Sequence, residues 1–204
     1  ARDSSCASSL VRPSSSIVAR PGGQYGRSPA ALAAAGRRLP FTLGRTGVDV
    51  VGINIRQDDL SSAEVQSLIA EHLSDMHSNS PPGYVHALAI ENLRAPSVTF
   101  WSAWMGGNLC GCGALKELDR ITGEVKSMRT RSAFLRRGVG QAVLDEIVRT
   151  GRQRGYSRLL LETGTGQAFE PAHALYRRSG FEWSGPFGEY AATDFNVFMA
   201  KFLV

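Results

Sequence analysis

A glycine-punctuated loop at residues 134–141, with the sequence FLRRGVGQ, constrains the fold of this chain more than any other segment. It follows the alternating segment EVKSMRT, which is typical of a strand, and opens the amphipathic run AVLDEIVRTGRQRG, which is typical of a helix. Gly138 and Gly140 can adopt positive φ and carry no Cβ, so the amides of residues 137–141 can converge on an anion. The N-terminus of the following helix adds its partial positive charge. The pattern therefore predicts a phosphate-binding loop between a strand and a helix.

The net positive charge of the chain belongs to its first 48 residues. Of the 23 basic and 18 acidic residues, seven arginines and Asp3 fall there, which leaves 16 bases against 17 acids in the remainder. A near-neutral remainder argues against nucleic-acid binding, although the overall charge is +5. We therefore expect no nucleic-acid partner.

The same residues 1–48 resemble a leader. They are rich in Ser, Arg, Ala, Gly and Pro and almost free of hydrophobic periodicity, which fits either a transit peptide or a disordered extension. The sequence has neither the compact apolar region of a secretory signal nor an apolar run of about 18 residues that could span a bilayer. We expect a soluble cytoplasmic protein without a membrane partner, or a plastid or mitochondrial one if the leader is a transit peptide.

Hydrophobic periodicity predicts one mixed α/β domain over residues 49–204. Ser61 and Glu64 have the spacing of a capping box that opens a helix, and Pro171 and Gly180 are placed to begin and end another. Turns at residues 106–108 and 119–123 join three alternating segments into an antiparallel meander. Strands are predicted at residues 50–56, 98–105, 109–118, 124–130, 157–163, 181–184 and 196–203, and helices at about 63–77, 84–93, 136–154 and 171–180.

Cysteine and histidine spacing gives no support for a metal site. Three cysteines do not make a disulfide framework, and Cys110 and Cys112 lie inside a strand pattern, which favours a buried pair of small side chains. His72 and His77 are five residues apart, off the same-face spacing of a helix. We expect no metal.

Two motifs resemble those of the GCN5-related N-acetyltransferase (GNAT) superfamily. The first, MRTRSAFLRRGVGQAVL, is similar to the acyl-CoA motif that runs from the fourth strand of the family through a glycine loop into a helix. The second comprises LLLET and then PAHALYRRSGF, similar to the family helix A-x-x-L-Y-x-x-x-G-F. The resemblance covers roughly residues 51–204, and small bacterial acetyltransferases are the most similar group. It implies a mixed, mostly antiparallel sheet flanked by helices, whose fourth and fifth strands splay apart.

The resemblance also implies acetyl-CoA as co-substrate, with its pantetheine between the splayed strands and its pyrophosphate on the glycine loop. Two positions depart from the family pattern: Leu135 replaces the usual Gln or Arg, and Phe169 replaces an Asn found in many members. Arg136 or Arg137 could supply the charge that Leu135 lacks. The implied cofactor-binding residues are Met128, Arg129, Thr130, Arg136, Arg137, Gly138, Val139, Gly140 and Gln141.

Transfer to an amine benefits from a base, because an amine near the lysine reference pKa of about 10.4 is mostly protonated at neutral pH. Glu117, Glu124 and Glu162 are candidates. Glu162 is preferred because its strand borders the expected splay and it interrupts an apolar run, and a solvated or ion-paired carboxylate is the alternative for each. Tyr176 aligns with the family tyrosine that often protonates the departing thiolate, and a core tyrosine is the alternative there.

The predicted activity is transfer of acetyl from acetyl-CoA to a primary amine of a small molecule or amino acid, by direct attack in a ternary complex. Three alternatives are a protein N-terminus or lysine as acceptor, a non-catalytic acyl-CoA-binding sensor, and a nucleotide-phosphate binder. For the third alternative, the expected Lys followed by Ser or Thr is absent after the glycine loop. The C-terminal strand could pair between the subunits of a homodimer. Candidate acceptor-binding residues are Asp75, His77, His86, Glu189 and Asp194.

Overall fold

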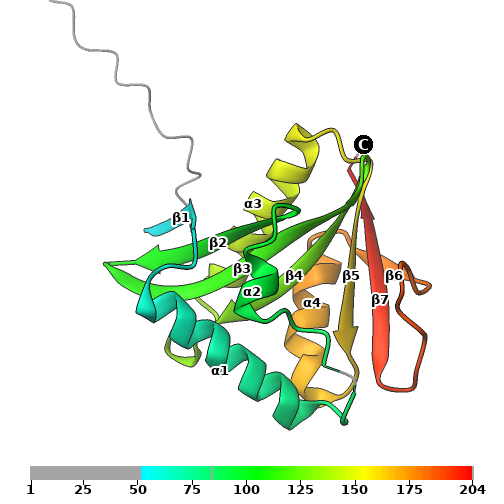
Figure 1. Cartoon of the computed structure of the whole chain (residues 1–204), viewed down its shortest axis with the longest axis horizontal. Coiled ribbons are helices and arrows are strands. Elements are labelled where there is room, and N and C mark those ends of the chain that lie inside the picture. The colour runs from blue at the N-terminus through cyan, green and yellow to red at the C-terminus, as the bar shows by residue number, and fades with distance from the viewer. Residues whose placement is uncertain (1–51, 84, 204) are drawn as a thin grey trace, which may run out of the picture. The chain divides into compact units, whose positions relative to one another are not determined.

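The computed structural model describes residues 52–83 and 85–203, which contain a seven-stranded sheet (Figure 1). The strand order is β1-β2-β3-β4-β5-β7-β6, and β4 and β5 are parallel whereas the other described pairs are antiparallel. This confirms the predicted mixed, mostly antiparallel sheet. The strands are β1 (Ile53–Gln57), β2 (Val98–Met105), β3 (Asn108–Asp119), β4 (Thr122–Thr130), β5 (Arg158–Gly164), β6 (Glu182–Ser184) and β7 (Asn196–Phe202).

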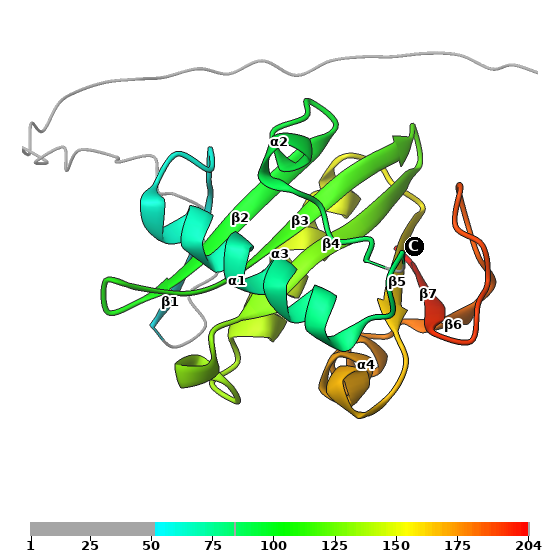
Figure 2. The same cartoon turned by 60° about the horizontal axis from the view of Figure 1, so that its bottom comes forward.

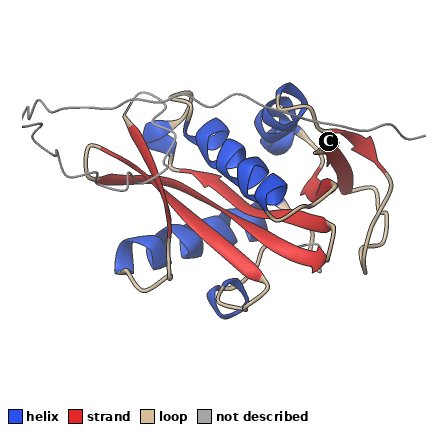
Figure 3. Ribbon diagram, turned by 90° about the horizontal axis from the view of Figure 1, so that it is seen from above, coloured by secondary structure: helices blue, strands red, loops and turns tan. Residues whose placement is uncertain are grey.

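Helices cover both faces of the sheet (Figure 3). One face carries α1 (Ala63–Asn79) and α2 (Ile90–Leu93), and α1 crosses β3 and β4 (Figure 2). The other face carries α3 (Val139–Gln153) and α4 (Glu170–Arg178). Within the described part of the chain, no helix combines the length and apolarity needed to cross a membrane. The predicted leader, residues 1–48, and the start of the domain at residue 49 lie outside the described residues.

Successive residues of a strand point to opposite faces of the sheet, so they contribute to two separate apolar clusters. One cluster lies under α3 and α4, and the other lies under α1 and α2. In β2, Phe100 belongs to the α1 cluster and Trp101 to the α3 cluster, and both are buried. Cys110 and Cys112 also face opposite clusters, although they are two residues apart, because the β2–β3 register shifts beside Cys110. Both thiols are buried and free, so the interpretation of the pair as small buried side chains is confirmed.

Helix α1 begins at Ala63 as predicted, but its capping residue differs from the prediction by one position. Ser62, not Ser61, is the N-cap, and its Oγ accepts a 3.3 Å hydrogen bond from the amide of Val65. The amide of Ser61 donates instead to Asp59, at 2.9 Å. Two serines in succession made the cap ambiguous, and the neighbouring aspartate resolves it.

Two other helices are shorter than predicted. The helix expected from residue 136 begins at Val139, because Gly138 has a φ of +85°, outside the range of a right-handed helix. The helix expected at residues 84–93 comprises only Ile90–Leu93, since Ala89 is extended.

The fourth and fifth strands separate after a short paired stretch. Their register runs from Thr122 opposite Arg158 to Glu124 opposite Leu160. Beyond that point β4 continues along β3 while β5 continues along β7, and the two strands diverge (Figure 1). The predicted splay is therefore confirmed, and it opens a gap in the sheet beside the glycine loop.

Candidate active site

A β-bulge in β4 shapes one wall of the gap. Ser127 and Met128 together oppose Gly113 of β3, and Ser127 has a φ of 53°. The Met128 side chain packs on the α3 side, where a Cβ added to Gly113 would lie 2.6 Å from its Sδ. Because the bulge adds one residue, Lys126 before it and Arg129 after it both project toward α1.

The glycine loop reaches α3 in a form suited to an anion. Gly138 is the N-cap of α3, and no described side chain caps this helix, so its first amides are open to a ligand. Gly140 is constrained differently: an added Cβ would lie 3.2 Å from Leu175 Cδ2 and 3.6 Å from Thr130 Oγ1. Gly138 therefore allows the positive φ of the turn before α3, and Gly140 lets α3 pack closely against α4 and β4.

The other residues of the predicted loop set differ in what they offer an anion. Arg136, with a φ of 60°, and Arg137 are exposed beside the uncapped helix end. Val139 is buried in the core, and the side chain of Gln141 donates to Ser179 Oγ at 3.0 Å. An anion at the start of α3 would therefore meet positive charge from the two exposed arginines and backbone amides from Val139 and Gln141.

Glu162 lies on β5 beside the gap. Phe198 of β7 is its partner on one side, and on the other side β4 has already diverged. Burial raises the pKa of the Glu162 carboxyl to about 7, while the charge of Lys126 opposes this rise and the charge of Glu124 adds to it. Such a group exchanges protons near neutral pH.

Glu124 is held in a closed ring of hydrogen bonds with two residues that the sequence prediction did not include. Its side chain is 1% exposed, and Lys126 Nζ lies 3.2 Å from Oε1. The hydroxyl of Tyr190, in the β6–β7 loop, donates to the same Oε1 at 2.6 Å and accepts from Lys126 Nζ at 2.7 Å. Contacts of this kind, between a carboxylate and an ammonium or hydroxyl donor, occupy Oε1 of Glu124.

Glu117 lies away from the gap. It pairs with Gly123, at a level where β4 and β5 are still paired, and it accepts a 2.8 Å hydrogen bond from the hydroxyl of Tyr156. The structure thus brings Glu124 and Glu162 together at the gap and leaves Glu117 in the paired part of the sheet.

Tyr176 projects from α4 into the α3-side core, where its ring lies 5.8 Å from that of Phe181. Burial raises the pKa of its phenol, and the charge of Glu162 raises it further. The phenol therefore remains protonated at neutral pH and lies within electrostatic reach of the Glu162 carboxyl.

The candidate acceptor-binding residues are scattered. His86, in the α1–α2 loop, packs edge-on against the aromatic ring of Tyr190, with 5.0 Å between the ring centres. It therefore lies beside the hydroxyl that contacts Glu124 and Lys126. Asp75 is ion-paired with Arg129. Of the other three, His77 has its Nδ1 2.7 Å from a carbonyl oxygen of its own helix, and Glu189 and Asp194 are exposed.

Lys126 had one signal in the sequence, since it is a charged residue on the same strand face as Glu124. Tyr190 had none, because its partners are 64 and 66 residues away along the chain.

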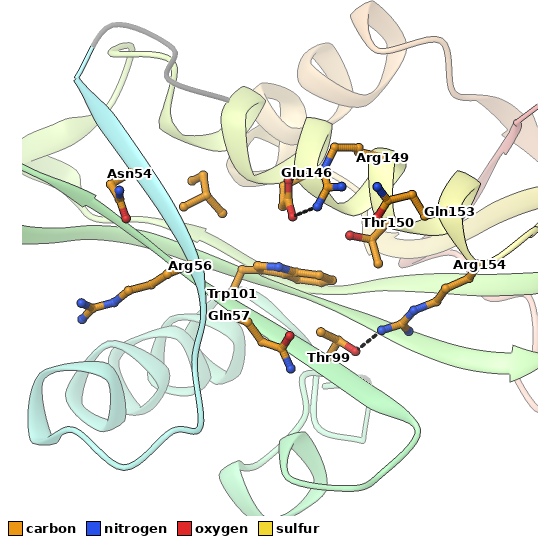
Figure 4. Close-up of a pocket in the computed structure, with 11 residues that line it drawn as sticks. Asn54, Arg56, Gln57, Thr99, Trp101, Glu146, Arg149, Thr150, Gln153 and Arg154 are labelled. Atoms are coloured by element: carbon orange, nitrogen blue, oxygen red, sulfur yellow. Dashed lines mark hydrogen bonds and ion pairs between the residues drawn. The ribbon is translucent and has the colours of Figure 1, made fainter. Parts of the chain in front are cut away.

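A separate pocket of about 480 Å³ lies between β1, β2 and α3 (Figure 4). Trp101 and Thr99 form part of its wall, and the Arg154 guanidinium donates to Thr99 Oγ1 at 2.5 Å. None of the predicted catalytic or cofactor-binding residues lines this pocket.

The chain matches the acetyltransferase (GNAT) family over residues 65–181, which is more than half of its length. The matched segment contains the splayed strands, the glycine loop and α4. This chain belongs to the GNAT family of N-acetyltransferases and is an acetyl-CoA-dependent acyltransferase.

Bacterial proteins are similar along almost their whole length. The uncharacterized N-acetyltransferase YsnE of Bacillus subtilis is 51% identical over 149 residues, which cover 73% of this chain and 99% of YsnE. The uncharacterized N-acetyltransferase YedL of Escherichia coli is 46% identical over 146 residues, covering 72% and 92%. Among solved structures, a GNAT acetyltransferase of Elizabethkingia anophelis with acetyl-CoA bound shares the fold with a TM-score of 0.53 at 16% identity, over 75% of this chain and 99% of that one.

Proposed function

We propose that this enzyme transfers the acetyl group of acetyl-CoA directly to a primary amine of a small molecule or amino acid while both substrates are bound. The observation that carries the proposal is the position of Glu162, whose partly buried carboxyl has a pKa of about 7 and lies on the strand bordering the gap. Acetyl-CoA supplies an acetyl group activated as a thioester. The chain must hold it, accept a proton from the amine and supply one to the departing sulfur.

The uncapped first turn of α3 and the gap both fit acetyl-CoA. The amides of residues 137–141 would bind the pyrophosphate, and the exposed side chains of Arg136 and Arg137 would add charge. The backbone of Met128, Arg129 and Thr130 borders the gap and would pair with the pantetheine as an added strand does.

Glu162 is the proposed general base. A carboxyl with a pKa of about 7 is partly ionised at neutral pH and is a stronger base than an ordinary glutamate. Glu124 is less suited to this role, since its Oε1 already accepts bonds from Lys126 and Tyr190. We therefore assign proton abstraction, directly or through one water, to Glu162.

Tyr176 is the proposed general acid. Its pKa is raised by burial and by Glu162, so the phenol carries its proton at the pH where Glu162 acts as a base. At neutral pH Glu162 is partly ionised whereas Tyr176 is protonated, so we assign the two groups opposite roles.

The test is thiol release from acetyl-CoA with a panel of amino acids, polyamines, aminoglycosides and peptides, after CoA binding has been confirmed for each variant. We expect amine-dependent release by the wild type and a loss of about 100-fold or more in Glu162→Gln and Tyr176→Phe. Glu182→Gln, on the exposed strand β6, and Tyr156→Phe, a buried tyrosine beside Glu117, are the matched controls and should retain release.

The other outcomes discriminate the alternatives. Release with peptides alone would redirect the assignment to a protein acceptor. Tight CoA binding with no release from any amine or protein would favour an acyl-CoA sensor and contradict the catalytic proposal.

A further inference from the structure

The buried side chains of Glu124 and Lys126 and the half-buried side chain of Tyr190 form a cluster on the α1 face of the sheet, where β4 and β5 begin to diverge. The side chains of Lys126 and Glu124 are 6% and 1% exposed, and the Tyr190 hydroxyl bonds both of them. A buried ion pair adds little net stability to a fold, because desolvation of the two charges offsets most of their attraction. Its location is therefore the more informative property.

The strand register places this ion pair opposite Glu162. Glu124 and Leu160 are the last partners before β4 and β5 diverge. Lys126 is two residues beyond Glu124 on β4, and Glu162 is two residues beyond Leu160 on β5. Because residues two apart in a strand share a face, Lys126 and Glu162 lie on the same face of the sheet, on opposite sides of the widening gap. The ion pair is therefore a fixed charge arrangement directly across from the proposed base.

We propose that the Glu124–Lys126 ion pair, fastened by Tyr190, acts as a positioning and charge-setting unit that fixes the pH range in which Glu162 works as the base. This inference rests on the proposed role of Glu162. Lys126 opposes proton uptake by Glu162 and Glu124 favours it, so the two charges of the intact pair act on Glu162 in opposite directions. Tyr190 prevents the pair from separating and makes its geometry depend on the β6–β7 loop.

The other titratable groups near Glu162 and the ion pair come from α4 and α1. From α4, Tyr176 has a raised pKa, and His173 Nε2 lies 2.9 Å from the carbonyl oxygen of Gly164. Behind Lys126, burial and the charge of Arg129 lower the pKa of His72 to about 4, so His72 adds no charge. The ion pair therefore provides the fixed charges that Glu162 senses most directly.

The test is the pH dependence of kcat/KM, which reports the ionisation of the free enzyme. Glu124→Gln leaves the Lys126 charge unopposed, so the acidic limb should move about one pH unit lower. Relative to its own plateau, this variant should then be about fivefold more active than the wild type at about pH 6. A loss of packing alone lowers activity at every pH and does not produce this gain.

The double variant Glu124→Gln/Lys126→Met removes both charges and is the matched control. Neutral replacements for a buried ion pair are often tolerated by the fold. The acidic limb of the double variant should return to within about 0.3 pH units of the wild-type position. CoA binding and thermal melting of each variant establish that it is folded.

Glu162→Gln separates failure of this inference from failure of the proposed function. An acidic limb that persists in Glu162→Gln would remove Glu162 as the base. If Glu162→Gln abolishes the limb but Glu124→Gln leaves it in place or moves it upward, the charge-setting role is overturned and the role of Glu162 stands.

Discussion

The hydroxyl of Tyr190 donates a 2.6 Å hydrogen bond to Oε1 of Glu124, and this contact joins the loop between β6 and β7 to the buried strand β4. His86, from the α1–α2 loop, packs edge-on against the same tyrosine. The α1–α2 and β6–β7 loops are thus connected through one phenol to the charges beside Glu162.

Tyr190→Phe should destabilise the protein while leaving acetyl-CoA binding intact. The variant loses one bond to a carboxylate and one from an ammonium group, which predicts a decrease of about 1.5–3 kcal/mol in the free energy of unfolding. Urea denaturation measures this quantity, and CoA titration should give an unchanged dissociation constant. An unchanged free energy of unfolding would show that the ring of hydrogen bonds does not hold the loop.

Gly138→Ala should weaken CoA binding beyond what backbone strain explains. Gly138 and Gly155 have φ angles of +85° and +75°, and neither would bring an added Cβ closer than 4.0 Å to a neighbour. Each alanine variant should therefore lose a similar amount of stability, about 1 kcal/mol. Gly155 follows the far end of α3, so only Gly138→Ala should also weaken CoA binding. Equal CoA affinity in the two variants would argue against a pyrophosphate site at the start of α3.

Glu162→Gln should be inactive and yet more stable than the wild type at alkaline pH. The folded-state pKa of about 7 lies above the ordinary glutamate value of 4.5, so the folded protein binds the proton more tightly than the unfolded chain. The resulting destabilisation is absent below about pH 4.5, grows as the pH rises and is complete above about pH 7. After allowance for partial exposure, we expect a gain on the order of 1–2 kcal/mol at about pH 8 and none at about pH 4.

Chemical denaturation of Glu162→Gln at the two pH values checks this prediction. Glu182→Gln, an exposed control on β6, should show no such gain. A Glu162→Gln variant that is less stable than the wild type at about pH 8 would mean that the carboxylate is stabilised in the fold.

Gly113→Ala should disturb the bulge in β4. An added Cβ would lie 2.6 Å from both Met128 Sδ and Val143 Cγ1, so the strand and α3 would have to move apart. Overpacking of this kind typically costs about 1–3 kcal/mol. Because Met128 borders the gap, CoA affinity should fall together with the melting temperature, and a variant with normal values of both would show that the bulge can adapt.

Local chemistry predicted most of the fold. The glycine loop, the strand before it and the helix after it are specified by neighbouring residues, whereas the splayed sheet was implied by the resemblance to the GNAT superfamily. The boundaries that differed were decided by competing local bonds, as where Asp59 takes the amide of Ser61 and leaves Ser62 to cap α1. The position of β7 between β5 and β6 depends on long-range pairing, which short-range patterns do not encode.

The candidate site was less predictable, because alternation does not distinguish one strand glutamate from another. Glu117, Glu124 and Glu162 all fit strand patterns, and only the end of β4–β5 pairing separates them. The bulge at Ser127 reverses the faces of the residues that follow it, so that Val125 and Met128 both pack on the α3 side although they are three residues apart. The partner of Glu124 in the loop between β6 and β7, Tyr190, is 66 residues away along the chain. Residue spacing along the sequence cannot predict a contact over that distance.

Mass spectrometry of the reaction products tests the central claim most directly. The protein is incubated with acetyl-CoA carrying an isotopically labelled acetyl group and with the amine panel, in parallel with Glu162→Gln and Glu182→Gln. We predict a labelled N-acetyl product with wild type and Glu182→Gln and at most a trace with Glu162→Gln. An equal yield from Glu162→Gln, or no labelled product from a wild type that binds CoA, would contradict acetyl transfer driven by this glutamate.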